Sequence, residues 1–249
     1  MKNGSRVWYG CLLLMAMTAD SVCWAQEADQ RFQITSSLEQ LYGAELAERY
    51  RDILEPEDMI NWQVYRPAHS DGKPPGVLVY VSPTGSGDMD GRWSKVLDKH
   101  NLVYIAADHS GNRIPVTRRM VMATSAIMAV RQQFEIDEER VYISGFSGGG
   151  RVASFLSNQY PTVFSGAIFI CGVNFWKEDL IEDLSPVLNN RYVFVSGTRD
   201  FNLQETRIVY RKYLKAGAEN SLLEIENGMT HALPNASTLT KALEFLDRK

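Results

Sequence analysis

The sequence has few cysteines, no excess of basic residues and no long hydrophobic run. Three cysteines in 249 residues are too few for a disulfide scaffold, and they lack the paired spacing of a zinc site. Thirty acidic and 26 basic residues give a net charge of −4, which leaves no basic excess to bind a phosphate backbone. These absences argue against a nucleic-acid-binding protein. The 45% content of hydrophobic residues instead predicts a folded domain with a full core.

Residues 1–25 have the layout of a signal peptide. Two basic residues precede an uncharged run over 7–19, and small residues at Cys23 and Ala25 suit a cleavage site. The uncharged run is well short of the roughly 20 residues that span a bilayer, which disfavours a membrane anchor. We therefore expect a secreted or periplasmic protein whose mature chain, 26–249, forms a single domain.

The rest of the sequence alternates short apolar runs with helical patterns. Continuous apolar runs rich in β-branched residues are typical of strands that are buried on both faces. Such runs, or shorter strand-like ones, lie at 62–65, 77–81, 102–107, 141–143, 167–170, 192–195 and 222–225. Helical patterns lie at 116–134, 151–158, 203–215 and 237–246, after a looser one over 36–54 that Gly43 interrupts. Strands separated by helices predict an α/β fold with a doubly wound, mostly parallel sheet. In such sheets the functional loops follow the carboxyl ends of the strands.

A G-x-S-x-G string follows the expected strand at 141–143. Its residues are Gly145-Phe146-Ser147-Gly148-Gly149, and a helical pattern begins soon after it. A serine on such a tight strand-to-helix turn takes a strained backbone conformation that projects its hydroxyl above the sheet. Side chains two residues before and after it would collide with backbone, which explains the two glycines. The string indicates Ser147 as a nucleophile and the Gly148 N–H as an oxyanion donor.

A serine nucleophile needs a base, and the base needs an orienting acid. In this architecture the acid and then the histidine follow the serine in sequence, each just after a strand. Asp200 follows the sixth expected strand, and His231, the only histidine after it, follows the seventh. Asp108 precedes the serine, and Asp179 and Asp183 have no adjacent strand end. The expected acid is therefore Asp200 and the expected base is His231.

Two further positions are expected at the mouth of this site. The second oxyanion donor should come from the glycine-rich loop 82–88, where we favour the Thr84 N–H and keep Gly85 as the alternative. His109 follows the third expected strand and is predicted to line the mouth. The alternative interpretation of the loop 82–88 is an ordinary glycine-rich turn without a role in the site.

The stretch 171–191 joins two neighbouring core strands and is too short to hold a lid domain. It therefore predicts an open cleft. Phe175 and Trp176 lie in this stretch, and Trp176 is a candidate substrate-binding residue in an aromatic wall for an acyl or aryl group. Packing of the two rings on the surface is the alternative.

Several of these segments resemble one known fold family. They lie at 110–113, 136–154, 197–200 and 231–234. The sequence resembles the α/β-hydrolase fold, and within it the secreted esterases similar to poly(3-hydroxybutyrate) depolymerases and to feruloyl and acetyl-xylan esterases. The resemblance implies a carboxylic ester hydrolase with Ser147, Asp200 and His231 as nucleophile, acid and base. The sequence departs from it at Ser82-Pro83, where many members have His-Gly. Depolymerases of solid polyester commonly carry a separate binding domain and linker, and none is evident here, which favours a smaller soluble ester.

The sequence therefore predicts a serine carboxylic ester hydrolase that acts through an acyl-enzyme on a soluble short-chain, aryl or carbohydrate ester. The expected partner is a small or oligomeric ester, with no nucleic acid and no membrane span, and neither a metal ion nor an organic cofactor is needed. A serine peptidase of the same fold is one alternative, although relatives of that kind often add a propeller domain that this length excludes. The other is a non-catalytic binding protein of the same fold, which is disfavoured because all three triad side chains are present.

Overall fold

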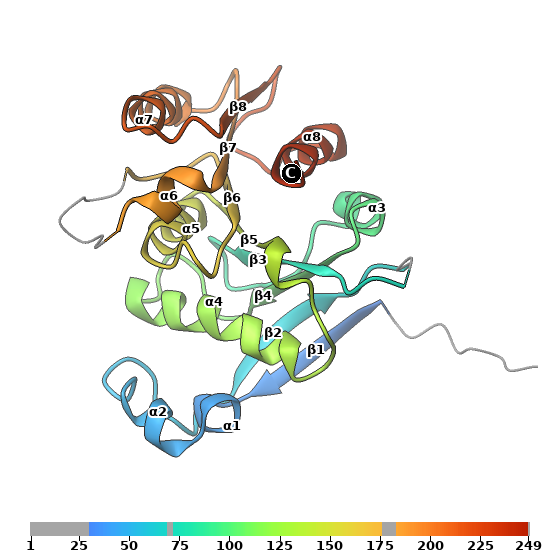
Figure 1. Ribbon diagram of the computed structural model, residues 1–249, viewed down its shortest axis with the longest axis vertical. Coiled ribbons are helices and arrows are strands. Elements are labelled where there is room, and N and C mark those ends of the chain that lie inside the picture. Colours follow the sequence, from blue (N-terminus) through green and yellow to red (C-terminus); the bar gives the residue numbers. More distant parts are fainter. Residues whose placement is uncertain (1–29, 69–71, 176–182, 249) are drawn as a thin grey trace, which may run out of the picture.

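The computed structural model describes residues 30–68, 72–175 and 183–248. Eight strands of these residues form one sheet in the order β1-β2-β4-β3-β5-β6-β7-β8 (Figure 1). The neighbours from β4 to β8 pair in parallel, whereas β2 pairs antiparallel with both β1 and β4. The strands are β1 (Arg31–Ser36), β2 (Ile60–Tyr65), β3 (Gly76–Val81), β4 (Leu102–Ala107), β5 (Val141–Phe146), β6 (Gly166–Ile170), β7 (Arg191–Gly197) and β8 (Ser221–Glu226).

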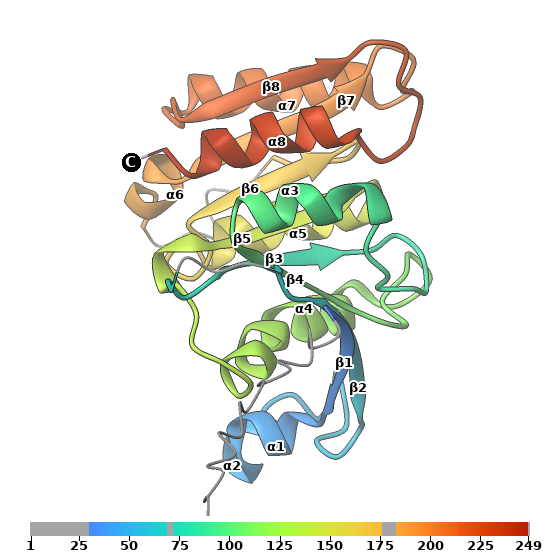
Figure 2. The same ribbon diagram turned by 90° about the vertical axis from the view of Figure 1, so that its right-hand side faces the viewer.

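The central strands are apolar because both of their faces are covered. Every residue of β3, GVLVYV, and of β4, LVYIAA, is buried. Such runs need no polar alternation, since neither face meets water. The edge strand β8 is only half-buried along its length. Figure 2 shows β3, β6, β7 and β8 pointing in the same direction, so the loops that follow these strands gather at the carboxyl ends of the strands.

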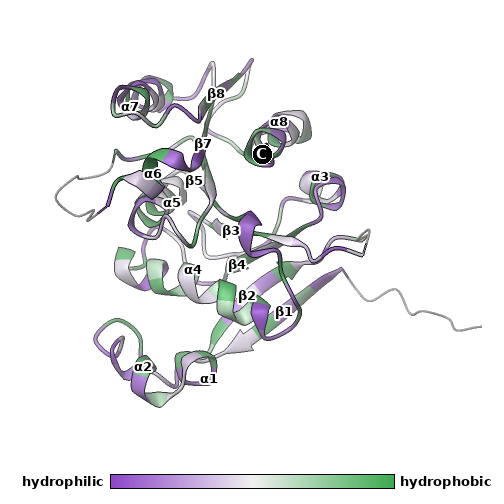
Figure 3. Ribbon diagram, in the orientation of Figure 1, coloured by the Kyte–Doolittle hydropathy of each residue, from purple (hydrophilic) through white to green (hydrophobic). Residues whose placement is uncertain are grey.

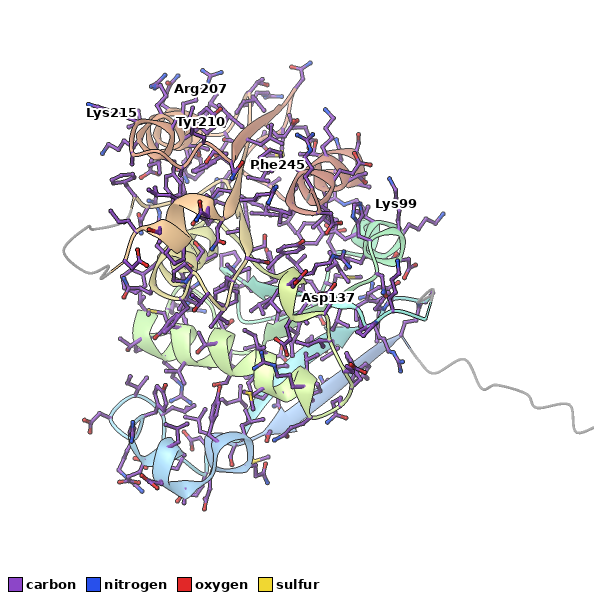
Figure 4. The ribbon with its side chains drawn as sticks, viewed as in Figure 1. Lys99, Asp137, Arg207, Tyr210, Lys215 and Phe245 are labelled. Carbon is purple, nitrogen blue, oxygen red and sulfur yellow. The ribbon has the colours of Figure 1, made fainter. Side chains whose placement is uncertain are left out.

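Helices cover both faces of the sheet, and each face has its own core. On the face of α4, α5 and α7, Phe194 packs edge-on against Tyr213, with ring centroids 5.0 Å apart. On the face of α3 and α8, Tyr80 packs edge-on against Trp93 at 5.8 Å. Hydrophobic and hydrophilic residues both occur on α7 and α8, as expected of helices with one buried side (Figure 3). The labelled Lys99 of α3 and Lys215 of α7 lie on their outer surfaces (Figure 4).

The described helices are α1 (Leu38–Tyr42), α2 (Ala44–Glu48), α3 (Ser94–Lys99), α4 (Val116–Arg131), α5 (Gly148–Gln159), α6 (Ser185–Asn189), α7 (Leu203–Lys215) and α8 (Ala236–Leu246). Two short 3-10 helices, η1 (Gly91–Trp93) and η2 (Glu138–Arg140), precede α3 and β5.

The predicted doubly wound, mostly parallel α/β sheet is confirmed, and all seven expected strands occur. One strand was not expected from the sequence. In β1 polar and apolar residues alternate, and Ile34 and Ser36 are its buried residues. The two helices α3 and α6 were also not expected, since each is too short to give a clear helical period.

Three expected helices differ from the observed bounds by more than one residue. The loose pattern over 36–54 forms two short helices, because Gly43 between them has a φ of 81°. The pattern over 116–134 ends as a helix at Arg131. The helix expected over 151–158 already begins at Gly148, because the turn at Ser147 leads directly into it.

The predicted signal peptide, residues 1–25, lies outside the described residues. Among the residues that the structure describes, no helix is both long and apolar enough to cross a membrane.

Candidate active site

Ser147 occupies the turn between β5 and α5, as the G-x-S-x-G string predicts. Its backbone has a φ of 55°, in the left-handed region that a residue with a Cβ rarely adopts. Its N–H donates to the Ile170 carbonyl of the neighbouring strand β6 at 2.8 Å, which anchors the turn. A strained backbone at a loop of this kind is typical of a functional residue that the surrounding structure holds in place.

The glycines around Ser147 are required by backbone packing. A Cβ at Gly145 would overlap the backbone of Gly149, and a Cβ at Gly149 would overlap the Val81 carbonyl at the end of β3. A Cβ at Gly172 would likewise overlap the backbone of Ser147. The expected collisions two residues before and after the serine are therefore confirmed.

We expect the substitution Gly149→Ala to destabilise the protein by about 1–3 kcal/mol or more, because the new methyl group meets rigid backbone. Thermal unfolding should show a melting temperature that is several degrees lower. The matched control is Gly85→Ala in the nearby loop, where a Cβ would meet nothing within 4 Å. Equal melting temperatures for the two variants would contradict this explanation of the glycine.

The structure brings the three expected triad side chains together. His231 Nε2 lies 2.9 Å from Ser147 Oγ, and His231 Nδ1 lies 2.8 Å from Asp200 Oδ1. Asp200 follows β7 and His231 lies in the loop after β8, so the two partners reach the serine from adjacent strand ends. The rival acid Asp183 is exposed and accepts a hydrogen bond from the Ser185 N–H instead.

Asp200 is buried and well supplied with hydrogen-bond donors. Ser196 donates to its Oδ2 at 2.6 Å, and the Asn202 N–H donates to its Oδ1 at 3.1 Å. Burial alone would raise the pKa of Asp200, but the hydrogen bonds from Ser196, the Asn202 N–H, His231 and Cys171 lower the pKa below its ordinary value. Asp200 therefore carries its negative charge at neutral pH, where it can orient His231 and stabilise its protonated form.

Cys171, the residue directly after β6, lies near the carboxylate of Asp200. Burial and the nearby carboxylate of Asp200 raise the pKa of its thiol well above the ordinary value, so it stays protonated and can donate. The ligand-capable atoms of Cys171, Asp200 and His231 lie within 4.8 Å of one another. The same nitrogen and oxygen atoms are already used in the hydrogen bonds between His231 and Asp200, so this arrangement fits an acid–base pair better than a metal centre.

Two phenylalanine rings contact the imidazole of His231. The Phe201 ring stacks on it, with centroids 4.1 Å apart and planes at 27°, and the Phe146 ring lies at 4.8 Å and 39°. Phe146 is half-buried and packs against the core on the α8 side of the sheet. Phe201 is 77% exposed.

The two expected oxyanion donors lie on different elements, one at the start of α5 and the other in the loop after β3. Gly148 is the first residue of α5, and a Cβ there would collide with the side chain of Asn112. In the loop after β3, the Thr84 N–H donates to Ser82 Oγ at 3.2 Å. The Thr84 N–H therefore has a partner within its own loop, and its role as a donor to substrate stays a prediction.

Arg119 ties together the loops after β3 and β4. Its buried guanidinium donates to the Ser110 carbonyl at 2.6 Å and to the Ser82 carbonyl at 3.0 Å. Burial lowers the pKa of Arg119 from its ordinary value, although an arginine keeps its charge in proteins. The neighbouring Arg118 points elsewhere, toward Asp58 at 3.5 Å on the surface.

The other expected mouth residues are placed as follows. His109 is exposed after β4, and its N–H donates to the Gly85 carbonyl at 2.7 Å, which sets its loop against the glycine-rich loop. Trp176 lies outside the described residues. Phe175 is half-buried and packs against Tyr213 of α7, with centroids 5.8 Å apart, which favours the alternative of packing for this ring.

The fold has close counterparts among solved structures. A ferulic acid esterase superposes with a TM-score of 0.62 at 15% identity, over 87% of this chain and 97% of that one. Fungal esterases from Rhizomucor miehei give a TM-score of 0.62 at 12% identity, over 90% and 84% of the two chains. The chain has the α/β-hydrolase fold. An acylaminoacyl peptidase also shares this α/β-hydrolase arrangement, with a TM-score of 0.57 at 16% identity, over 78% of this chain and 40% of that one.

The sequence itself matches one family model. Residues 101–188 match the model described as Esterase PHB depolymerase, which is less than half of the chain. No curated protein sequence matches the chain as a relative. The esterase match within an α/β-hydrolase fold indicates a serine hydrolase.

Sequence reasoning missed four residues that surround the site: Phe201, Ser196, Asn112 and Arg119. Phe201 directly follows the expected acid Asp200, and this position is the sequence signal that could have placed its ring near the site. The other three act through side-chain contacts that no local pattern reveals.

Proposed function

We propose that the protein is a carboxylic ester hydrolase with Ser147, His231 and Asp200 as its catalytic triad. The observation that carries the proposal is the continuous chain from Ser147 Oγ to His231 Nε2 at 2.9 Å and from His231 Nδ1 to Asp200 Oδ1 at 2.8 Å. Ser147 itself lies at a strained turn after β5, where its hydroxyl can reach the carbonyl of a bound substrate. The match to an esterase family model supports an ester as the substrate.

The geometry supports a two-step reaction through an acyl-enzyme. His231 Nε2 accepts the Ser147 proton as Oγ attacks the ester carbonyl, and Asp200 stabilises the imidazolium that forms. The Gly148 N–H, with the Thr84 N–H as the proposed second donor, donates a hydrogen bond to the negatively charged oxygen. His231 then gives its proton to the alcohol oxygen, and the carbon–oxygen bond to the alcohol breaks. In the second step His231 deprotonates a water molecule that attacks the acyl carbon, the bond to Ser147 Oγ breaks, and His231 returns the proton to Ser147 Oγ as the acid leaves.

The proposed substrate is a soluble short-chain, aryl or carbohydrate ester. The stretch between β6 and β7 is short, which favours an open cleft over a lid. An open cleft predicts ester hydrolysis that does not require a lipid aggregate. The similarity to a ferulic acid esterase is consistent with an aryl or carbohydrate ester.

A serine peptidase is the second candidate, because an acylaminoacyl peptidase shares the fold. The chain spans only 40% of that peptidase, however, so the similarity covers one part of it. Amide bonds are also harder to cleave than esters with the same triad, since the amine is a poorer leaving group. We therefore propose esters as the preferred substrates.

Parallel assays on aryl esters, alkyl esters and peptide anilides test this function. We expect hydrolysis of the esters and at least a hundredfold lower kcat/KM for the anilides. A fluorophosphonate probe should label the folded protein at Ser147 and should not label heat-denatured protein or the Ser147→Ala variant. Anilides cleaved faster than esters would favour the peptidase, and a folded protein that neither reacts with the probe nor hydrolyses any substrate would refute the proposal.

A further inference from the structure

Phe201 is the most exposed large hydrophobic side chain in the described part of the chain. Its 77% exposure compares with 55% for Val116 and 53% for Met59. Exposure of a phenylalanine forgoes the free energy that burial would contribute, so packing in the hydrophobic core does not explain the residue. Single exposed apolar side chains are common, but this one also contacts the proposed catalytic base.

The backbone around Phe201 is held by two hydrogen bonds. The Asn202 N–H donates to Asp200 Oδ1 at 3.1 Å, and the Asn202 side chain donates to the Cys171 carbonyl at 2.7 Å. Phe201 lies between these anchored neighbours, and its ring stacks on the His231 imidazole at 4.1 Å. One face of the ring is therefore fixed on His231, while most of the side chain remains open to solvent.

The chemistry of the proposed reaction defines which part of a substrate lies near this ring. His231 Nε2 must come within hydrogen-bonding distance of the alcohol oxygen in order to protonate it as it leaves. In the proposed mechanism the carbonyl oxygen of the ester points away from His231, toward the Gly148 N–H. The group attached to the alcohol oxygen therefore lies next to the imidazole, and Phe201 covers one face of that imidazole.

We propose that Phe201 is a specificity-determining residue that contacts the alcohol portion of the ester and favours apolar or aromatic alcohols. This inference rests on the proposed esterase function. Aromatic side chains bind flat apolar groups well because they offer a large rigid face with few rotatable bonds. A small alcohol such as methanol is too short to cover the exposed ring, so it gains little from the contact.

Two matched ester series separate the alcohol side from the acyl side. The first keeps the acetyl group and changes the alcohol, from methyl through butyl to benzyl acetate. The second keeps the ethyl group and changes the acid, from acetate through butyrate to phenylacetate. Acid release is followed by titration at constant pH for wild type, Phe201→Ala and Phe201→Leu.

The expected result is a loss that depends on the alcohol. For Phe201→Ala, kcat/KM should fall about tenfold for benzyl acetate, mainly through KM, and less than threefold for methyl acetate. Phe201→Leu should keep part of the preference, because leucine retains apolar area but no flat face. The ratios within the acyl series should stay within a factor of two of the wild-type ratios.

The deacylation rate distinguishes specificity from positioning. All acetates give the same acetyl-enzyme after the alcohol has left, so Phe201 can affect its hydrolysis only through His231. We expect deacylation in Phe201→Ala to stay within threefold of wild type.

The matched control is Tyr160→Ala, since Tyr160 is an aromatic residue with 45% exposure at the far end of α5, roughly 18 Å along the helix from Ser147.

Equal losses for methyl and benzyl acetate would show that Phe201 only positions His231 and would overturn the proposal. A loss that follows the acyl series would overturn it as well, since the ring would then lie on the acyl side. These outcomes require a wild-type protein that hydrolyses esters. A wild type inactive on both series would instead refute the proposed function, and the inference with it.

Discussion

Replacing Ser147 by alanine is expected to lower kcat for ester hydrolysis by about 10^6-fold. The reason is that in the proposed mechanism Ser147 Oγ forms the bond to the acyl group, and among the described hydrogen bonds it is the hydroxyl that lies against His231 Nε2. His231→Ala should cost nearly as much, because an unassisted serine hydroxyl is a weak nucleophile. The double variant should be no slower than either single variant, since the two side chains act as one unit.

Stopped-flow and long end-point assays on an aryl ester measure this loss over the required range. Ser94→Ala on α3 is the matched control, because the Ser94 hydroxyl donates to the Gly91 carbonyl of its own turn. The control should hydrolyse the ester at the wild-type rate. Losses that multiply in the double variant would show that Ser147 and His231 contribute independently, contrary to a shared proton transfer.

The substitution Asp200→Asn is expected to lower kcat/KM by about 10^4-fold. An asparagine has nearly the same shape as the aspartate, but it carries no charge to stabilise protonated His231. Its amide group can also favour the wrong histidine tautomer, in which Nε2 carries the proton and cannot accept one from Ser147. The large loss should therefore occur without unfolding, which thermal melting can verify.

Asp183→Asn is the control for this substitution, since Asp183 was a rival acid by sequence and is exposed in the structure. It should leave kcat/KM unchanged. Because the pKa of Asp200 lies below its ordinary value, the carboxylate loses its charge only in strongly acidic solution. Protonation of Asp200 should therefore not limit wild-type activity anywhere between pH 5 and pH 9. If Asp200→Asn retained a tenth of wild-type activity, another group would have to orient His231.

The fold and the meeting of the three proposed triad side chains could be predicted because they depend on local patterns that repeat along the chain. The buried runs of β3 and β4 are apolar at nearly every position, and each marks a strand without reference to its neighbours. The carboxyl ends of parallel strands meet at one edge, so Asp200 and His231 could be expected beside Ser147 from the strand order alone.

The surroundings of the site could not be predicted in the same way. Ser196 and Asp200 are four residues apart, but nothing local indicates that the hydroxyl turns toward the carboxylate. Phe175 has the same aromatic character as Phe201, yet one packs beneath α7 and the other lies open beside His231. Which of two similar side chains faces a site depends on the path of each loop, and that path is set by tertiary contacts.

The buried guanidinium of Arg119 makes one structural unit of two loops that are separate in sequence. It belongs to α4, and it joins the carbonyl of Ser82 after β3 to the carbonyl of Ser110 after β4. We therefore expect a shift of the first turns of α4 to affect both loops, including the backbone at Ser82, two residues before Thr84. The loop that carries the proposed second oxyanion donor is thus hydrogen-bonded to a helix that contributes no reacting group to the proposed mechanism, and we expect changes in the first turns of α4 to alter the proposed ester cleavage while Ser147, His231 and Asp200 stay in place.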